Sequence, residues 1–192
     1  MTRLSVFNHV SLDGFFAGPN GEIDWFQAVH DDEWNRYAQE HSDISSSTLM
    51  FGHTTYRMMK SWWPTPPAMK ADPAMAQVMN DSPKIVFSKR LKKAQDEPTW
   101  KNIRVIDEID PAEIRNLKRR ERITVLGSGT IVQQLANLRL IDEYTLLLVP
   151  IVLGKGRPLF KAVGKTTLDL VEQRAFRNGV VLLRYQPAHG AA

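Results

Sequence analysis

The sequence predicts a three-layer α/β/α fold, in which a mostly parallel sheet ends in antiparallel strands near the C-terminus. Over the first two thirds of the chain, apolar strand-like segments alternate with helix-like segments, a pattern typical of a parallel sheet covered on both faces. The last third has two strand-like segments, 166–174 and 179–186, joined by Arg177-Asn178-Gly179, which predicts a hairpin. No shift in composition marks a boundary, so we expect residues 1–192 to form a single domain.

The individual elements follow from local signals along the chain. The first strand ends at the Asp13-Gly14 turn, and the glycines of 13–24 predict a loop. Acidic residues at 31–33 suit the N-terminus of a helix, whereas the prolines of 63–73 predict a second loop. Strands are expected at 3–10, 48–51, 84–87, 103–106, 122–126 and 143–149. Helices are expected at 31–43, 53–62, 111–121 and 130–138, with another starting after Pro73.

The composition is that of an ordinary globular protein. Hydrophobic residues make up 43% of the chain and charged residues 24%, which excludes global disorder. Apolar stretches such as Leu146–Leu153 are far shorter than the ~20 residues of a membrane helix, and Asn8 and His9 interrupt any signal-peptide core. The absence of cysteine excludes a disulfide framework and a thiolate nucleophile. We therefore expect a cytoplasmic protein without a membrane partner, and the histidine spacing gives no reason to expect a metal.

Charge is unevenly distributed between the two parts of the chain. Residues 1–80 have 5 basic and 9 acidic side chains, a net charge of −4, whereas residues 81–192 have 20 and 12, a net charge of +8. A basic half suggests an anionic ligand. The densest basic run, Arg115–Arg122, has no interleaved aromatic residue, which favours a solvated helix face over a nucleic-acid site. A small phosphorylated ligand is the simpler explanation.

Three strand-to-helix or strand-to-loop connections suit such a ligand. In the first, Gly127-Ser128-Gly129 follows a buried strand and precedes a helix that includes Thr130 and Ile131. A turn of this kind directs free backbone N–H groups toward an anion, and glycine permits close approach and a positive φ. The turn lacks the third glycine of the Rossmann fingerprint, since Val132 stands in its place.

The other two connections have hydroxyl and cationic side chains. Gly52-His53-Thr54-Thr55 leads from a strand into a helix, and its hydroxyls are able either to cap that helix or to bind phosphate. The segment Ser88–Lys93 follows strand 84–87 and contains a hydroxyl and four cations, including Lys89. Because open α/β sheets bind ligands at the carboxyl ends of their strands, the three connections together predict a dinucleotide site.

Five segments of the sequence resemble the motifs of a known family. The segments SLDGFFAGPNGEIDW, LMFGHTTYRMMKSWWP, KIVFSKRL, VLGSGTIVQQL and DEYTLLLVPIVLGKGRPLF occur in the order typical of the dihydrofolate-reductase-like superfamily. The similar branch is named for the reductase domain at the C-terminus of the bifunctional riboflavin-biosynthesis deaminase-reductase. This resemblance spans essentially the whole chain, and it implies an NADPH-binding α/β/α fold that is often dimeric.

The resemblance also implies roles for individual residues. Gly52–Thr55 and Gly127–Ile131 would flank the pyrophosphate, and Ser88 and Lys89 would meet the adenosine 2′-phosphate. Two departures stand out: His53 replaces the usual arginine, and Lys60-Ser61-Trp62-Trp63-Pro64 replaces the acidic segment of the true riboflavin reductases. The second departure puts their ribityl-pyrimidine substrate in question for this chain.

The remaining candidates concern the reaction itself. We expect the nicotinamide near Val10 and Ser11, at the end of the first strand, beneath a candidate lid at 13–24. Asp13 and Trp25 are assigned to substrate binding. Dihydrofolate reductases place a carboxylate on the helix after the first loop, where Asp31 or Asp32 falls nearest, although both residues also suit a helix N-terminus.

The sequence thus predicts an NADPH-dependent reductase of a small pterin- or pyrimidine-like heterocycle. The alternatives are a non-catalytic nucleotide-binding regulator and a flavin- or deazaflavin-binding oxidoreductase on the same fold. A homodimer is expected as well, because segments such as Thr145–Val152 are apolar on both strand faces. No helix is predicted after residue 138 to cover them, although helices 31–43 and 111–121 offer an alternative cover in a monomer.

Overall fold

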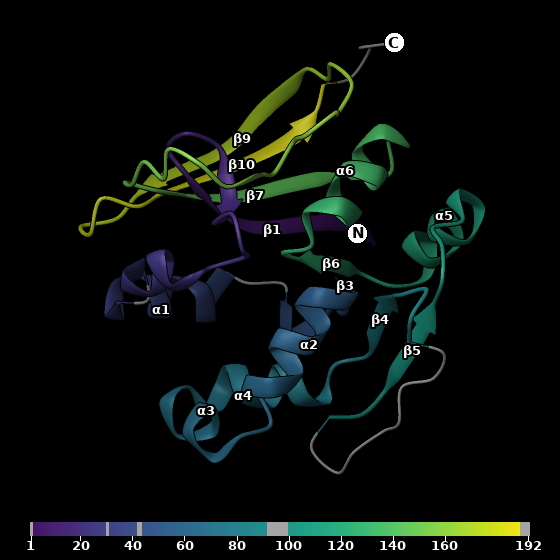
Figure 1. The fold of residues 1–192 in the computed structure, drawn as a ribbon, viewed down its shortest axis with the longest axis horizontal. Coiled ribbons are helices and arrows are strands. Elements are labelled where there is room, and N and C mark those ends of the chain that lie inside the picture. The colour runs from purple at the N-terminus through teal and green to yellow at the C-terminus, as the bar shows by residue number, and fades with distance from the viewer. Residues whose placement is uncertain (1, 30, 42–43, 92–99, 189–192) are drawn as a thin grey trace.

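In the computed structural model, the described residues are 2–29, 31–41, 44–91 and 100–188. They contain an eight-stranded sheet with the order β5-β4-β3-β6-β1-β7-β10-β9 (Figure 1). Its strands are β1 (Leu4–Ser11), β3 (Thr48–Gly52), β4 (Lys84–Phe87), β5 (Ile103–Ile106), β6 (Ile123–Leu126), β7 (Glu143–Val149), β9 (Leu168–Ala175) and β10 (Val181–Pro187). From β5 to β7 all neighbouring strands are parallel, whereas β10 is antiparallel to both β7 and β9. The predicted fold class is confirmed.

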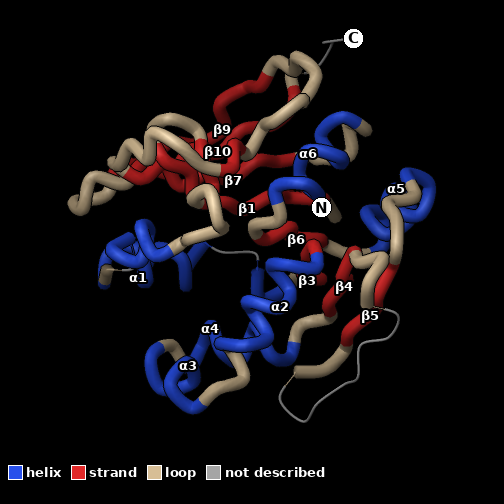
Figure 2. The backbone as a smooth tube through the Cα atoms, in the orientation of Figure 1, coloured by secondary structure: helices blue, strands red, loops and turns tan. Residues whose placement is uncertain are grey.

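Helices lie on both faces of this sheet (Figures 1 and 2). They are α1 (Asp32–His41), α2 (His53–Trp62), α3 (Pro66–Ala71), α4 (Pro73–Asp81), α5 (Pro111–Arg120) and α6 (Gly129–Asn137), with 3₁₀ turns at Asp24–Val29 and Ile44–Ser46. The helix predicted at 31–43 is observed as α1, which ends at His41. The last two predicted residues, Ser42 and Asp43, lie outside the described residues. The other predicted helices agree with the observed ones to within one residue at each end.

Alternation along the strands separates the two faces and their cores. On one face, Leu4, Val6 and Val10 of β1 pack with residues of α5 and α6, among them Ile114 and Leu135. On the opposite face, α1 packs against β7 and β10, while α2 and α4 pack against β3 and β4. Because β1 is a central strand whose side chains point alternately to either face, residues along it reach both layers.

Two predicted loops contain regular structure. Within 13–24, β2 (Phe15–Ala17) pairs with β8 (Arg157–Pro158) in a separate two-stranded sheet. Within 63–73, Pro66 and Pro67 begin α3. Both predictions were wrong for a physical reason. Strand β2 forms only by pairing with β8, which is distant in the sequence. Proline is well suited to the first turn of a helix, because the N–H groups there have no intrahelical acceptor.

The apolar faces of β7 are covered within the chain, which corrects part of the argument for a dimer. Leu147 and Val149 pack with Trp34 and Tyr37 of α1. On the other face, Tyr144 is buried and its ring contacts Phe160. Exposed apolar side chains remain at Val152, just after β7, and at Leu170 and Val171 of β9, at the edge of the sheet.

Across the residues that the structure describes, none of the helices combines the length and the apolar character needed to span a bilayer.

Candidate functional site

A crevice lies at the carboxyl ends of β3 and β6, where the strand order of the sheet changes direction. Strands β3 and β6 are neighbours, yet α2, which follows β3, lies on one face and α6, which follows β6, lies on the other. In open α/β sheets, the carboxyl ends of two such strands bound the ligand site. The two segments that the sequence analysis singled out, Gly52–Thr55 and Gly127–Ile131, both lie at this crevice.

A cavity of about 1290 Å³ occupies the crevice and extends across the sheet between α1 and α2. It is lined by parts of β1, β6 and β7, by the N-terminal ends of α2 and α6, and by the segment after β4. The predicted cofactor residues among its lining are Gly52, His53, Thr54, Thr55, Ser88, Lys89, Gly127, Ser128, Gly129, Thr130 and Ile131. Its volume is somewhat above the range of about 300–1,000 Å³ common for small-ligand pockets.

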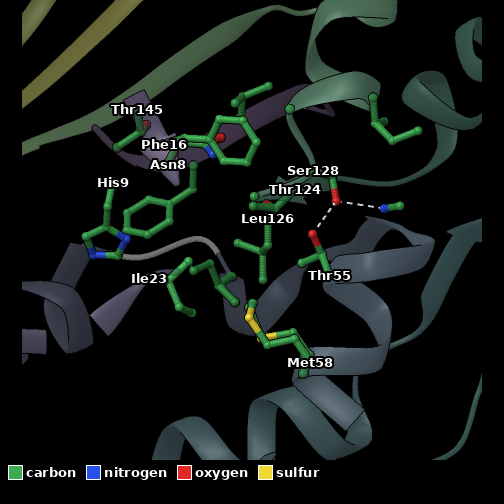
Figure 3. A pocket seen from close by; sticks show the side chains of 18 of the residues that line it. Asn8, His9, Phe16, Ile23, Thr55, Met58, Thr124, Leu126, Ser128 and Thr145 are labelled. Carbon is green, nitrogen blue, oxygen red and sulfur yellow. Dashed lines mark hydrogen bonds between the residues drawn. The ribbon is translucent and has the colours of Figure 1, made fainter. Parts of the chain in front are cut away.

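Ser128 joins the two helix N-termini at the edge of this cavity. The backbone N–H of Gly52 donates to Ser128 Oγ at 2.7 Å, and the Ser128 hydroxyl donates to Thr55 Oγ1 at 2.8 Å (Figure 3). Ser128 has the left-handed conformation, with φ at 57°, which is uncommon for a residue with a side chain. This conformation therefore accompanies a side chain that connects two elements distant in sequence.

The structure corrects the reason for which the turn needs glycine at position 129. Positive φ occurs at Gly127 and Ser128, whereas Gly129 is limited by space. A Cβ built on Gly129 would lie 2.4 Å from Cε1 of Phe16, far inside van der Waals contact. The short strand β2, which contains Phe16, therefore packs directly on the N-terminus of α6.

The two helices that begin at the crevice between β3 and β6, α2 and α6, lack side-chain caps. In α1, α3, α4 and α5, side chains accept hydrogen bonds from the first turn: those of Asp31, Thr65, Asp72 and Asp110. Neither α2 nor α6 has such a cap, and both helices lie wholly within the described residues. Their first-turn N–H groups, with the positive end of each helix dipole, face a shared space.

The segment after β4 adds hydroxyl and cationic groups to the same edge. Ser88 Oγ accepts hydrogen bonds from the backbone N–H groups of Arg90 and Leu91, at 3.2 and 2.9 Å. A serine hydroxyl has two acceptor sites and one proton, so that proton points to His53 Nδ1, 3.0 Å away. The other ring nitrogen of His53, Nε2, is not used by this hydrogen bond. Lys89 and Arg90, which follow Ser88, are exposed. Lys92 and Lys93, predicted to contribute, lie outside the described residues.

Val10, Ser11 and Asp13 are not brought into the cavity lining. Val10 is buried in the core beneath α6. The Ser11 hydroxyl donates to Asp13 Oδ1 at 2.7 Å, and Asp13 accepts hydrogen bonds from the backbone N–H groups of Leu153 and Gly154. The hydrogen bond from Ser11 is the largest cause that lowers the pKa of Asp13 below its ordinary value of 3.8. Asp13 therefore fastens the turn after β1 to the loop after β7.

Trp25, Asp31 and Asp32 also lie outside that lining. Trp25 donates its indole N–H to the carbonyl of Glu22 at 3.2 Å and packs edge-on against Phe26. Asp31 Oδ1 accepts from the Trp34 N–H at 2.8 Å, which makes it the cap of α1. The structure therefore favours the helix-terminus interpretation of the two acids.

Other cavity residues were missed by the sequence analysis, and three of them are labelled in Figure 3. Asn8 and His9 of β1 and Thr145 of β7 line the cavity. The ring of His9 stacks on Phe26, with centroids 4.1 Å apart and planes 5° apart. Thr145 pairs with Phe7 across the β1–β7 ladder. These residues have no local motif, and only the strand pairing brings them together.

At the amino ends of β1 and β7, the cavity reaches a buried carboxylate. Glu143, whose side chain is 3% exposed, lies 2.8 Å from a guanidinium nitrogen of Arg3 and 3.6 Å from Arg184. Arg184 in turn contacts Glu172 at 3.0 Å, and Tyr37 donates its hydroxyl to Glu172 at 2.6 Å. Burial, followed by this hydrogen bond, raises the pKa of Tyr37 to about 12. The charges at this end of the cavity are therefore paired with one another.

The fold is an α/β sheet with a crevice at the carboxyl ends of β3 and β6. Residues 3–182 match the family described as the RibD C-terminal domain, and the chain belongs to that family. This confirms the resemblance drawn from the sequence motifs.

Individual relatives agree over most of the chain. The Bacillus subtilis (strain 168) protein YyaP, described as uncharacterized, is 27% identical over 179 residues, which cover 92% of this chain and 90% of YyaP. A putative riboflavin biosynthesis protein from Shewanella sp. PV-4 superposes with a TM-score of 0.73 at 20% identity, covering 97% of this chain and 99% of that one.

A third similar structure is a Thermotoga maritima diaminohydroxyphosphoribosylaminopyrimidine deaminase/5-amino-6-(5-phosphoribosylamino)uracil reductase. It has a TM-score of 0.64 at 16% identity, and the match covers 97% of this chain but 56% of that protein. At these identities, the two solved structures support the fold alone.

Proposed function

We propose that this protein is an NADPH-dependent reductase of a small pyrimidine- or pterin-like heterocycle. The observation that supports this proposal most directly is the pair of uncapped helix N-termini, joined through Ser128, at the edge of one cavity. A pyrophosphate requires several N–H donors and a positive potential in one place. The two helices together supply both.

The residues present fit the phosphate groups of the cofactor. In the proposal, the N–H groups of Gly129 and Thr130 and those at the start of α2 hold the pyrophosphate. Lys89 and His53, whose ring is held by Ser88, bind the adenosine 2′-phosphate through charge-assisted hydrogen bonds. The nicotinamide then extends toward the carboxyl half of β1. When bound, NADPH would supply a hydride.

The substrate is proposed to bind between α1 and α2, over the floor of the sheet. Leu126 and Met58 line this part of the cavity and provide apolar contact for a flat ring (Figure 3). Thr145 lines it with a hydroxyl group that is suited to a ring nitrogen or oxygen atom, whereas the Thr124 hydroxyl donates to Ser47. Membership of the RibD C-terminal domain family supports a substrate of this class.

Reduction of such a ring also consumes a proton. Asp31 and Asp32, the carboxylates considered from the sequence, lie outside the cavity lining. His9 lies within it, held by its stack on Phe26, and histidine exchanges protons near neutral pH. We assign delivery of this proton to His9, while Phe16 and the rest of β2 exclude water from the reacting atoms.

The test is turnover. Mixing the protein with NADPH and a panel of aminopyrimidines and dihydropterin precursors should oxidise NADPH in the presence of at least one of them, with a reduced product detected by mass spectrometry. The variant His9→Gln should lower kcat by about 10²–10⁴-fold, the range for a lost general acid, and leave NADPH affinity near wild type. Stoichiometric NADPH binding without oxidation would instead indicate a nucleotide-binding regulator, and displacement of NADPH by a flavin would indicate the flavin-dependent alternative.

A further inference from the structure

Asn8 is a buried side chain whose amide oxygen has an unusual environment. It is 3% exposed, and its Oδ1 has no hydrogen-bond partner among the described residues. An asparagine amide has two acceptor sites and two donors, and leaving such a group unpaired in the interior is costly. Asn8 also lines the cavity, and Figure 3 places it near Phe16. A ligand is therefore the natural partner for this amide.

Buried hydroxyl groups of the cavity, unlike the Asn8 amide oxygen, have hydrogen-bond partners. Ser5 Oγ is 3.2 Å from Thr124 Oγ1, and Thr124 donates to Ser47 Oγ at 3.0 Å. Ser128 and Thr55 are bonded to each other. Within the described part of the chain, these hydroxyls satisfy one another, whereas Asn8 is left to an external group.

The position of Asn8 in the cavity indicates which group of a bound ligand it would contact. Side chains alternate along β1, and Asn8 shares a face with Val6 and Val10, which pack beneath α6. The Gly127 N–H donates to the carbonyl of Phe7 at 3.4 Å, so the glycine turn adjoins β1 beside Asn8. His9 points to the opposite face, where it stacks on Phe26. Asn8 therefore belongs to the cofactor side of the cavity and His9 to the substrate side.

We propose that the side-chain amide of Asn8 binds the carboxamide of the nicotinamide ring, an inference that rests on the proposed function. One ribose separates this ring from the pyrophosphate, so a cofactor held at Ser128–Thr130 has its ring within reach of β1. A carboxamide has one acceptor and one N–H₂ donor side by side, and it pairs with the asparagine amide in both directions. Asn8 is thereby a positioning residue that sets the orientation of the ring.

The test compares two ligands in the variant Asn8→Leu, which has a similar size but no polar atoms. Dissociation constants are measured by calorimetry for NADPH and for adenosine 2′,5′-bisphosphate, which lacks the nicotinamide. The variant should bind NADPH about tenfold or more weakly, the loss expected for about 1.4 kcal/mol. Its affinity for the bisphosphate should not change. The melting temperature of the ligand-free protein should stay the same or rise, because a buried unpaired acceptor has been removed.

An NADP⁺ analogue with an acetyl group in place of the carboxamide identifies the group that Asn8 contacts. The analogue keeps the acceptor oxygen and lacks the N–H₂, so the difference between wild type and Asn8→Leu should be smaller for it than for NADP⁺. The control is Asn80→Leu. Asn80 is buried, and its own Oδ1 has no hydrogen-bond partner within the described residues, but it lies outside the cavity lining and donates to the Trp63 carbonyl. This variant should lower stability and leave both affinities unchanged.

The outcomes separate the two proposals. Equal NADPH affinity in wild type and Asn8→Leu, an undiminished difference with the analogue, or equal weakening of both ligands would overturn the role of Asn8 alone. Failure of the folded wild type to bind NADPH would overturn the proposed function and this inference with it. If Asn8→Leu does not fold, Asn8→Ser, which is smaller and retains polarity, is measured with the same expectations for the two ligands.

Discussion

Ser128 connects two helix N-termini through a single hydroxyl group. The hydroxyl accepts from the Gly52 N–H and donates to Thr55, and the backbone adopts a left-handed conformation to place it. The cost of that conformation, of order 1–3 kcal/mol, is offset by hydrogen bonds that hold the N-termini of α2 and α6 side by side. The glycines on either side of Ser128 marked this turn in the sequence, whereas the hydrogen bonds of Ser128 to the start of α2 are visible only in the structure.

Gly129→Val should weaken cofactor binding without unfolding the protein. A side chain at this position meets the ring of Phe16, so that ring must move, and the added methyl groups cover the N–H donors of α6. We expect NADPH affinity to fall by at least tenfold, about 1.4 kcal/mol, as measured by calorimetry, with an unchanged circular dichroism spectrum.

The control for that variant is Gly164→Val. A Cβ on Gly164 would have Asn137 Oδ1 as its nearest neighbour, at 3.8 Å, and Gly164 lies outside the cavity lining. This variant should bind NADPH as wild type does. Normal NADPH binding by Gly129→Val would mean that the turn is structural only.

At the scale of elements, local signals predicted most of the fold. Strands 84–87 and 103–106 have the predicted bounds, because short apolar runs between turn residues determine them. Strand β2 was not predictable in this way, since its partner β8 lies 140 residues further along the chain. The same reason explains the site: the glycine turn is local, whereas Asn8, His9 and Thr145 meet only through strand pairing.

Lys84 is a second feature that no local pattern indicates. It is 1% exposed, and its ammonium group donates to the carbonyls of Asn80, Ser82 and Lys101 at 2.9, 2.7 and 3.2 Å. It also lies over the ring of Trp100, 4.5 Å from the centroid. Lys84 thereby joins the end of α4 to the start of β5.

Lys84→Met should lower the free energy of unfolding by about 1.5–3 kcal/mol, the value for hydrogen bonds to a charged group, because three carbonyls lose their donor. Urea denaturation measures this loss. Lys101→Met is the control: that side chain is 48% exposed and lies 4.0 Å from Asp81, so its removal should cost at most about 1 kcal/mol. Equal stability of the two variants would contradict a structural role for Lys84.

At the scale of the whole molecule, we propose that residues 1–192 form one domain that associates as a homodimer. Leu170 and Val171 are 50% and 51% exposed on β9, which is the last strand of the sheet. Exposed apolar edge strands are prone to pairing, and twofold contacts are the commonest way to cover them.

Light scattering at micromolar concentration should give about twice the chain mass of 21.9 kDa. Val171→Lys places a charge on this edge and should give the monomer mass, with the fold retained by circular dichroism. A wild-type mass of one chain, or a dimer unaffected by Val171→Lys, would contradict association through β9.

The central claim, a site built for NADPH, is tested most directly by parallel titrations of the protein with NADPH and NADH. We expect micromolar or tighter binding of NADPH and weaker binding of NADH, since only NADPH has the 2′-phosphate that we propose contacts Lys89 and His53. Lys89→Ala should reduce this preference by about 1.5–3 kcal/mol and leave NADH binding nearly unchanged. Equal affinity for the two cofactors, or no binding of either, would contradict the account.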